Sequence, residues 1–130
     1  MNSGSERKII STPEAPKAIG PYAQAIRHGG LLFVSGMIPI RPETGELLTG
    51  DFEAEVTLVL ENIRAVVAAG GMGLENVLKA TVFLKDLGQF GKFNEIYNRY
   101  FGDILPARET VQVARLPRDA SIEISVICGK

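Results

Sequence analysis

The sequence predicts an α+β domain in which a single mixed β-sheet carries two helices on one face. Six short segments show the side-chain alternation of strands, and two longer segments show apolar residues at the three- and four-residue spacing of helices. The first helical segment is followed directly by a strand segment, which is typical of a crossover connection.

Length, charge and cysteine content narrow the class of protein. The 130 residues suit one domain, expected to span residues 1–130 with a flexible polar end at residues 1–7. A formal net charge of −1 with scattered basic residues argues against a nucleic-acid partner. The single cysteine, Cys128, excludes an intramolecular disulfide and argues against a cysteine-based zinc site. With no membrane-spanning apolar run and no signal-peptide core, the expected location is cytoplasmic, unless an organelle presequence has been removed.

A proline-rich segment follows a short expected edge strand at Lys8–Ser11. Residues 12–22 contain three prolines, which exclude regular structure and make the segment stiff. That stiffness suits the segment to hold Tyr22 at a fixed place, either in a pocket or as a plug at the edge of the core.

Strands at Ala23–Arg27 and Leu31–Ser35 are predicted to form a hairpin around a glycine turn. The second strand runs into Ser35 and Gly36. A serine followed by a glycine at the end of a strand lets a ligand approach the backbone closely, although an ordinary bulge has the same sequence.

The two helices are expected at Asp51–Ala69 and Phe90–Phe101, with a strand at Val77–Leu84 between them. Asp51 is a suitable N-cap for the first helix. Asn94 lies near the start of the second helix, one step away from its apolar stripe. Its side chain is therefore expected in solvent or in a neighbouring pocket.

The strand between Pro106 and Pro117 carries the first candidate catalytic residue, Arg108. Side chains alternate across a strand, so Arg108, Thr110 and Gln112 share one face. The planar guanidinium group of arginine can bind a carboxylate through two parallel hydrogen bonds. An ion pair with an acidic neighbour, or simple exposure to water, is the alternative for this arginine.

The last expected strand, Ser121–Cys128, carries the second candidate catalytic residue, Glu123. One row of this strand is apolar and includes Cys128, which we expect to be a buried and inert thiol. Glu123 lies in the other row and is suited to act as a general acid or base through a water molecule.

The polar rows of these strands are expected on the sheet face opposite the helices. That face is too mixed for a surface exposed to water and too polar for a core, so we expect an oligomer with a polar pocket between subunits. The side chains assigned to it are Thr81, Phe83, Arg108, Thr110, Gln112, Glu123, Ser125 and Ile127.

The distance between Arg108 and Glu123 depends on how the strands pair. A simple hairpin of the last two strands would separate them by about 13 Å along the strand. A shifted register, a ligand with a water molecule, or contact across subunits would each bring them to one site. A direct ion pair between the two side chains is a further alternative.

Short motifs, taken in order along the chain, resemble the signatures of the RidA (YjgF) family. Each motif is weak alone, but together they are highly specific and span nearly the whole chain. They are Ile19–Ala25, Phe33–Pro39, Lys79–Asp86, Phe93–Tyr97, Pro106–Arg108, Val113–Pro117 and Ile122–Ile124.

The resemblance implies a chorismate-mutase-like fold and a homotrimer with clefts between subunits. It also implies hydrolysis of 2-aminoacrylate, 2-iminopropanoate and 2-iminobutanoate to 2-oxo acids and ammonia, with no metal or organic cofactor. Pyridoxal-phosphate dehydratases would supply these intermediates. By position, Arg108 matches the family's carboxylate-binding arginine, and Glu123 matches the acidic residue that holds the hydrolytic water. The matching pocket positions are Tyr22, Ser35, Gly36 and Asn94.

Three positions depart from the family pattern. Thr110 stands where archetypal bacterial members often have cysteine, so thiol chemistry is absent, although its hydroxyl or backbone N–H is still able to contact a ligand. Met37 stands where many members have glutamine and is expected to narrow or dry the pocket. Glu109 replaces a small residue and is expected on the face opposite Arg108. These departures concern substrate preference more than reaction type.

Two other functions are known among relatives of this kind. One is a holdase-type chaperone or a small-carboxylate-binding protein without catalysis, and the presence of both Arg108 and Glu123 argues against it. The other is an endoribonuclease, against which the absence of a basic cluster argues.

Overall fold

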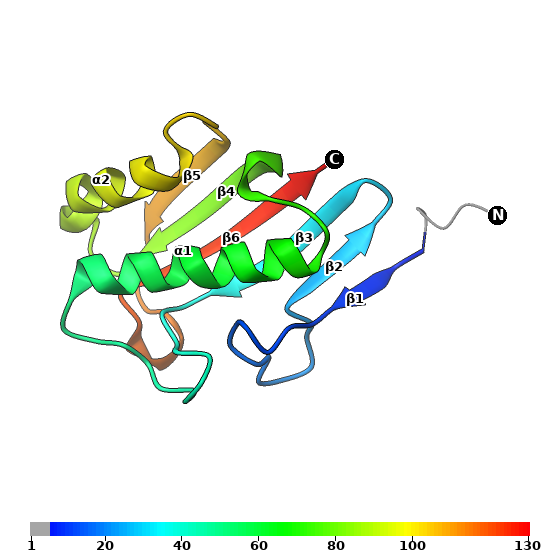
Figure 1. The fold of residues 1–130 in the computed structure, drawn as a ribbon. Coiled ribbons are helices and arrows are strands. Elements are labelled where there is room, and N and C mark those ends of the chain that lie inside the picture. The colour runs from blue at the N-terminus through cyan, green and yellow to red at the C-terminus, as the bar shows by residue number, and fades with distance from the viewer. Residues whose placement is uncertain (1–5) are drawn as a thin grey trace.

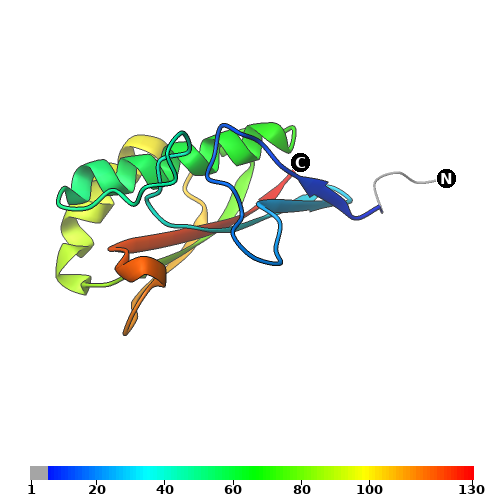
Figure 2. The same ribbon diagram turned by 90° about the horizontal axis from the view of Figure 1, so that it is seen from below.

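The computed structural model describes residues 6–130 and has one six-stranded sheet with both helices on one face (Figures 1 and 2). Residues 1–5, which belong to the expected flexible end, lie outside the described residues. The order of strands and helices along the chain is the predicted one. The elements are β1 (Lys8–Ile10), β2 (Ala25–His28), β3 (Leu31–Met37), α1 (Phe52–Ala69), β4 (Val77–Leu84), α2 (Phe90–Phe101), β5 (Ala107–Gln112) and β6 (Ile122–Gly129).

Strand β4 lies between β5 and β6 in the sheet order β1-β2-β3-β6-β4-β5. It pairs with β5 in parallel, and α2 is the crossover between these two strands. All other neighbouring strands are antiparallel. The last two strands are therefore not neighbours, and the simple hairpin considered from the sequence is wrong. Strand β5 ends at Gln112, before Pro117, because its partner β4 ends at Leu84 opposite Gln112.

The hydrophobic core fills the space between the sheet and the helix layer, while the opposite face carries no α-helix within residues 6–130 (Figure 2). Full burial of a large apolar side chain contributes roughly 1.5–3 kcal/mol, so the many buried side chains of this layer hold α1 and α2 against β4 and β6. Fully buried examples are Val56, Val59, Ile63, Phe93, Ile96, Val82, Ile122 and Ile124.

Two irregularities alter the strand faces that simple alternation predicts. In β4, a register shift between Val77 and Lys79 buries Val77 and leaves Leu78 52% exposed, which is the reverse of the expected order. In β3, a second shift lies between Val34 and Met37, where the sequence has Ser35 and Gly36. The bulge that the sequence offered as one interpretation of this serine and glycine is thus present.

A buried carboxylate connects the start of α1 to the start of β6. Glu55 is only 5% exposed. It accepts hydrogen bonds from the backbone N–H of Asp51 at 2.8 Å and from the hydroxyl of Ser121. Asp51 in turn caps the helix by accepting from the N–H of Ala54 at 3.2 Å, which confirms the predicted N-cap. Because Ser121 precedes β6, this network positions the strand that carries Glu123.

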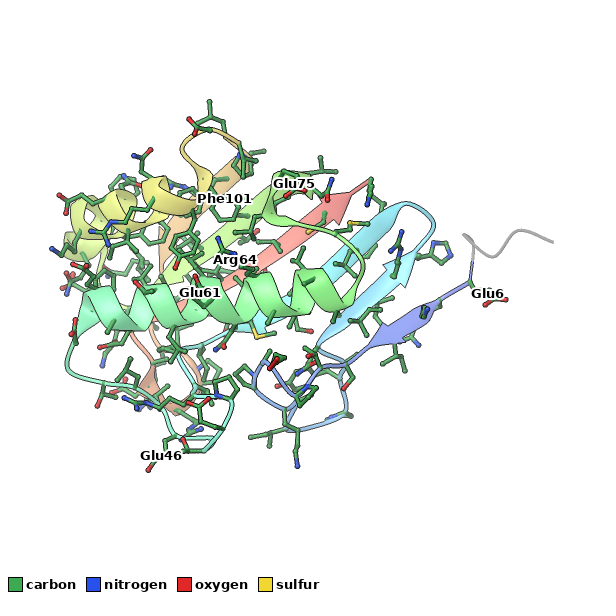
Figure 3. All side chains as sticks on the ribbon, viewed as in Figure 1. Glu6, Glu46, Glu61, Arg64, Glu75 and Phe101 are labelled. Carbon is green, nitrogen blue, oxygen red and sulfur yellow. The ribbon has the colours of Figure 1, made fainter. Side chains whose placement is uncertain are left out.

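We expect the substitution Glu55→Ala to lower the free energy of unfolding by about 2–4 kcal/mol, because two hydrogen bonds to a charged group are lost and the Ser121 hydroxyl is left unpaired. Urea unfolding at one fixed protein concentration measures this change. Glu46→Ala is the control, since Glu46 is exposed and projects away from the body of the molecule (Figure 3), and it should change the free energy by less than about 0.5 kcal/mol. Equal unfolding midpoints for Glu55→Ala and wild type would contradict the expected role.

Candidate functional site

The side chain of Gln24 holds the proline-rich segment in place. It is 5% exposed, accepts from the N–H of Thr12 at 2.7 Å and donates to the carbonyl of Pro16 at 2.8 Å. An irregular backbone has few partners of its own, and this amide supplies them. The segment carries Tyr22, which is 54% exposed. The sequence analysis did not predict this role for Gln24. The feature that could have indicated it is a polar residue among apolar residues directly after the prolines.

Ser35 and Gly36 lie at the bulge of β3 and contact two different groups. The Ser35 hydroxyl donates to the carbonyl of Ala23 at 2.6 Å, so it fixes the segment after Tyr22. At Gly36, a Cβ atom would overlap with the carboxylate of Glu123. The glycine therefore permits a close approach to its backbone, and the group that approaches is the Glu123 side chain, whereas the sequence predicted a ligand there.

Glu123 is half-buried and has no hydrogen bond or ion pair from its side chain within residues 6–130. Burial raises the pKa of its carboxyl group, because the charged form loses hydration without gaining a partner. A carboxyl group that can hold or release a proton closer to neutral pH suits general acid or base chemistry.

A hollow of about 270 Å³ adjoins this carboxyl group, and we call it the Glu123 hollow. Three of the predicted site residues, Tyr22, Gly36 and Glu123, line it together. Met37, which stands where many family members have glutamine, also lines it. Its walls are mostly apolar, and its full lining is Pro16, Lys17, Ala18, Ile19, Tyr22, Gln24, Gly36, Met37, Ile38, Ile40, Pro117, Arg118 and Glu123.

Arg108 packs against aromatic rings of α2. Its Cζ atom lies 4.8 Å from the ring centre of Tyr97, 5.3 Å from that of Phe93 and 5.7 Å from that of Phe90. No hydrogen bond or ion pair is formed by its side chain in the described part of the chain. Neither alternative from the sequence, an ion pair with a neighbour or simple exposure, describes this arrangement. The N–H groups of the stacked guanidinium are free to bind a planar anion.

A second hollow, of about 650 Å³, adjoins Arg108, and we call it the Arg108 hollow. Asn94 lines this hollow. Its side chain therefore lies at a pocket, which was one of the two placements expected from the sequence. Thr110 follows two residues after Arg108 on the same face, and its buried hydroxyl oxygen has no hydrogen-bond partner among the described residues. The full lining is Gly91, Asn94, Glu95, Tyr97, Asn98, Phe101, Gly102, Leu105, Pro106 and Arg108.

The two candidate catalytic residues point to opposite faces of the sheet, which corrects the prediction that they share one. Arg108 pairs with Ala80 of β4, and Ala80 is fully buried under the helices. Glu123 pairs with Phe83, whose row faces away from the helices. From the strand spacing and rise, their Cα atoms are about 14 Å apart.

The same pairing corrects the placement of the neighbouring polar residues. Thr110 and Gln112 pair with Val82 and Leu84, so they lie on the helix side with Arg108. Glu109 is on the other face, as predicted, where its carboxylate forms an ion pair of 2.6 Å with Lys79.

Three further features of the described residues bear on function. Burial raises the pKa of Cys128 to about 11, so its thiol stays protonated, in agreement with the expected inert role. Across residues 6–130, no three His, Cys, Asp or Glu side chains are grouped to hold a metal ion. The helices of this part of the chain are all too short or too polar to span a membrane.

Comparison with known proteins identifies the family. Residues 12–129 match the family model described as Endoribonuclease L-PSP. A RutC family protein of Pyrococcus horikoshii is 51% identical over 124 residues, which cover 95% of this chain and 98% of the relative. The chain belongs to the RidA (YjgF) family.

Solved structures of RidA-family proteins have the same fold. The Escherichia coli YjgF gene product is 42% identical, with a TM-score of 0.90 over 95% of this chain and 98% of that one. Escherichia coli TdcF, a provisionally named reactive intermediate deaminase, is 44% identical, and its structure with bound serine has a TM-score of 0.90 over 95% of this chain and 98% of that one. The expected chorismate-mutase-like fold is therefore confirmed.

We expect Glu123→Gln to be more stable than wild type at pH 7. Burial raises the pKa of the Glu123 carboxyl above its ordinary value of 4.5, so the folded protein binds this proton more tightly than the unfolded chain. Ionisation at neutral pH therefore lowers the free energy of unfolding, and a neutral glutamine avoids that cost. The difference in urea midpoint should close as the pH falls below 4.5.

The control for this pH series is Glu46→Gln, which changes an exposed carboxylate and should give no pH-dependent gain. A Glu123→Gln variant that unfolds at the same or lower urea concentration than wild type at pH 7 would refute the argument from burial.

Proposed function

We propose that this RidA-family chain hydrolyses reactive 2-enamino and 2-imino acids to 2-oxo acids and ammonia. The observation that carries the proposal is a complementary pair of groups that have no hydrogen-bond or ion-pair partner within residues 6–130: the stacked guanidinium of Arg108 in one hollow and the half-buried carboxyl of Glu123 in the other. Arg108 would bind the substrate carboxylate, and Glu123 would position a water molecule. The substrates proposed are 2-aminoacrylate, 2-iminopropanoate and 2-iminobutanoate.

The proposed reaction requires little from the protein beyond orientation and proton transfer. An enamine first takes up a proton at C3 and loses one from its nitrogen, which converts it into the imine. Glu123 then accepts a proton from the water as its oxygen bonds to the electrophilic C2 carbon, and it returns that proton to the nitrogen. The resulting carbinolamine then collapses: Glu123 moves its hydroxyl proton to the nitrogen, the C–N bond breaks, and ammonia leaves as the C=O bond of the 2-oxo acid forms. A carboxyl group with a raised pKa suits both halves of this transfer.

The remaining predicted residues are proposed to shape the pocket. Tyr22 and Gly36 would border the substrate on the Glu123 side, where Ser35 holds their backbone in place. Asn94 and Thr110 would contact it on the Arg108 side, through the amide and the unpaired hydroxyl. No metal or organic cofactor is part of this proposal.

The two hollows would form one site only between copies of the chain, because they lie on opposite faces of one sheet. We therefore propose a homotrimer in which Arg108 of one subunit meets the Glu123 hollow of its neighbour. The face without helices supports an interface, since it exposes large apolar side chains. These are Leu31, Phe33, Leu78 and Val111, each between 41% and 52% exposed.

Two properties of relatives support the choice of substrate. TdcF has a name that refers to reactive intermediates, and its structure contains serine, an amino acid with a carboxylate next to a nitrogen-bearing carbon. Imino acids have the same two groups. We propose that cytoplasmic pyridoxal-phosphate dehydratases supply them.

The endoribonuclease in the family model's description is the competing function. The chain has 14 basic and 15 acidic residues, so a strong electrostatic attraction to RNA is not expected. Salt dependence separates the two activities, since RNA cleavage would fall steeply with added salt and imine hydrolysis would not.

We expect Arg108→Ala to reduce kcat/KM for 2-iminobutanoate by about 100-fold or more, because two charge-assisted hydrogen bonds to the carboxylate are lost. A dehydratase generates the imine, and semicarbazide trapping measures how much escapes hydrolysis. Arg41→Ala, in an exposed turn, is the matched control and should behave as wild type. If wild type does not accelerate 2-oxo-acid formation at all, the deaminase proposal fails, and binding without catalysis takes its place.

Coexpression of Arg108→Ala and Glu123→Gln chains tests whether one site uses two subunits. Each variant alone lacks one group at every site. In any mixed trimer, one interface of the three joins an intact Arg108 to an intact Glu123, so random mixing in equal amounts should restore about one quarter of wild-type activity. Sites contained within a single chain would give no recovery, and that result would refute the proposed arrangement.

A further inference from the structure

Tyr97 has a buried hydroxyl group without a partner. The residue is 8% exposed, and its hydroxyl oxygen forms no hydrogen bond within residues 6–130. Buried hydroxyl groups nearly always have a partner, because leaving one unpaired costs stability. The group therefore requires a partner other than the atoms of residues 6–130 of its own chain.

The ring of Tyr97 does not need this hydroxyl for packing. It stacks between Phe93 and Phe101, with ring centres 5.3 Å and 4.8 Å away. Both neighbours are phenylalanines, and both are buried to 1% exposure or less. A third phenyl ring would fill the same space without an unpaired oxygen.

Tyr97 lies next to Arg108. The guanidinium carbon of Arg108 lies 4.8 Å from the centre of the Tyr97 ring, and both residues line the Arg108 hollow. Asn94 and Asn98 line it from the same side of α2, at three- and one-residue separations from Tyr97. An anion bound to the guanidinium thus lies beside the tyrosine.

The protonation state of Tyr97 suits a hydrogen-bond donor. Burial raises the pKa of its hydroxyl above the ordinary value of 10.0, and the nearby charge of Arg108 opposes this to a smaller extent. The group therefore keeps its proton at neutral pH. A donor without a partner among residues 6–130, next to a guanidinium that has none there either, is complementary to a carboxylate.

We propose that the Tyr97 hydroxyl donates a hydrogen bond to the substrate carboxylate that Arg108 binds, which makes Tyr97 a substrate-binding residue. This inference rests on the proposed function, and it defines the ligand class more closely: a planar carboxylate that accepts from a guanidinium and a phenol together. Imines without a carboxylate would gain nothing from either group.

Tyr100 offers a matched control on the same helix. An arginine, Arg64, also lies over its ring, with 5.3 Å from Cζ to the ring centre. Here, however, the hydroxyl donates to Glu61 of α1 at 2.7 Å. Figure 3 shows Glu61 and Arg64 on α1, and neither residue lines the Arg108 hollow. The two tyrosines therefore differ in whether the hydroxyl already has a partner.

The test compares Tyr97→Phe with Tyr100→Phe. For Tyr97→Phe we expect KM for 2-iminobutanoate and Kd for 2-oxobutanoate, measured by calorimetry, to rise together by about tenfold. Its kcat should change little, and its Tm should equal or exceed that of wild type, because an unpaired buried hydroxyl is removed. Tyr100→Phe should show the opposite pattern, with a lower Tm and unchanged KM and Kd.

Unchanged KM and Kd in Tyr97→Phe would overturn the inference. A loss of affinity that accompanies a lower Tm or a dissociated oligomer would also overturn it, because the hydroxyl would then have a structural partner. The Kd measurement separates this inference from the proposed reaction. Wild type that binds 2-oxobutanoate without hydrolysing any imine refutes the reaction, while the comparison of Kd values still decides the role of Tyr97.

Discussion

The hydrogen bonds of β4 to β5 on one side and to β6 on the other determine where the candidate functional groups lie. Through its register with β5, β4 directs Arg108 toward the helices, and through its register with β6 it directs Glu123 away from them. The crossover helix α2 then supplies the aromatic rings on which the guanidinium rests. A single strand thus places the guanidinium of Arg108 and the carboxyl group of Glu123 on opposite faces of the sheet.

Each face of the sheet carries polar groups that have no partner within residues 6–130, and their chemistry is complementary. Arg108, Tyr97 and Thr110 offer hydrogen-bond donors on the helix side, while Glu123 offers a carboxyl group with a raised pKa on the other. Such groups lower stability when they are buried without partners. Groups of this kind persist where a ligand or another subunit completes them, which agrees with the site proposed between copies of the chain.

Side-chain hydrogen bonds fix the segments of the chain that surround the Glu123 carboxyl group. Gln24 secures the proline-rich segment, Ser35 ties it to β3, and Glu55 anchors the start of β6. These contacts come from parts of the chain that are distant in sequence. The pocket therefore depends on the whole fold to hold the tyrosine, the glycine backbone and the carboxyl group at fixed separations.

The sequence by itself determined the order of the elements, the ends of β4 and α2, the Asp51 cap and the chemistry of the candidate residues, because these depend on local periodicity and residue type. It also identified the family through motifs spread along the chain. Only the tertiary structure decided that Arg108 and Glu123 face opposite sides. Alternation fixes which residues within one strand share a face, but the relation between two strands depends on their pairing, here through β4, and on bulges such as the one at Leu78. The apolar stripe of α2 was predictable from its residue spacing. Only the fold placed Arg108 over the aromatic rings of that stripe.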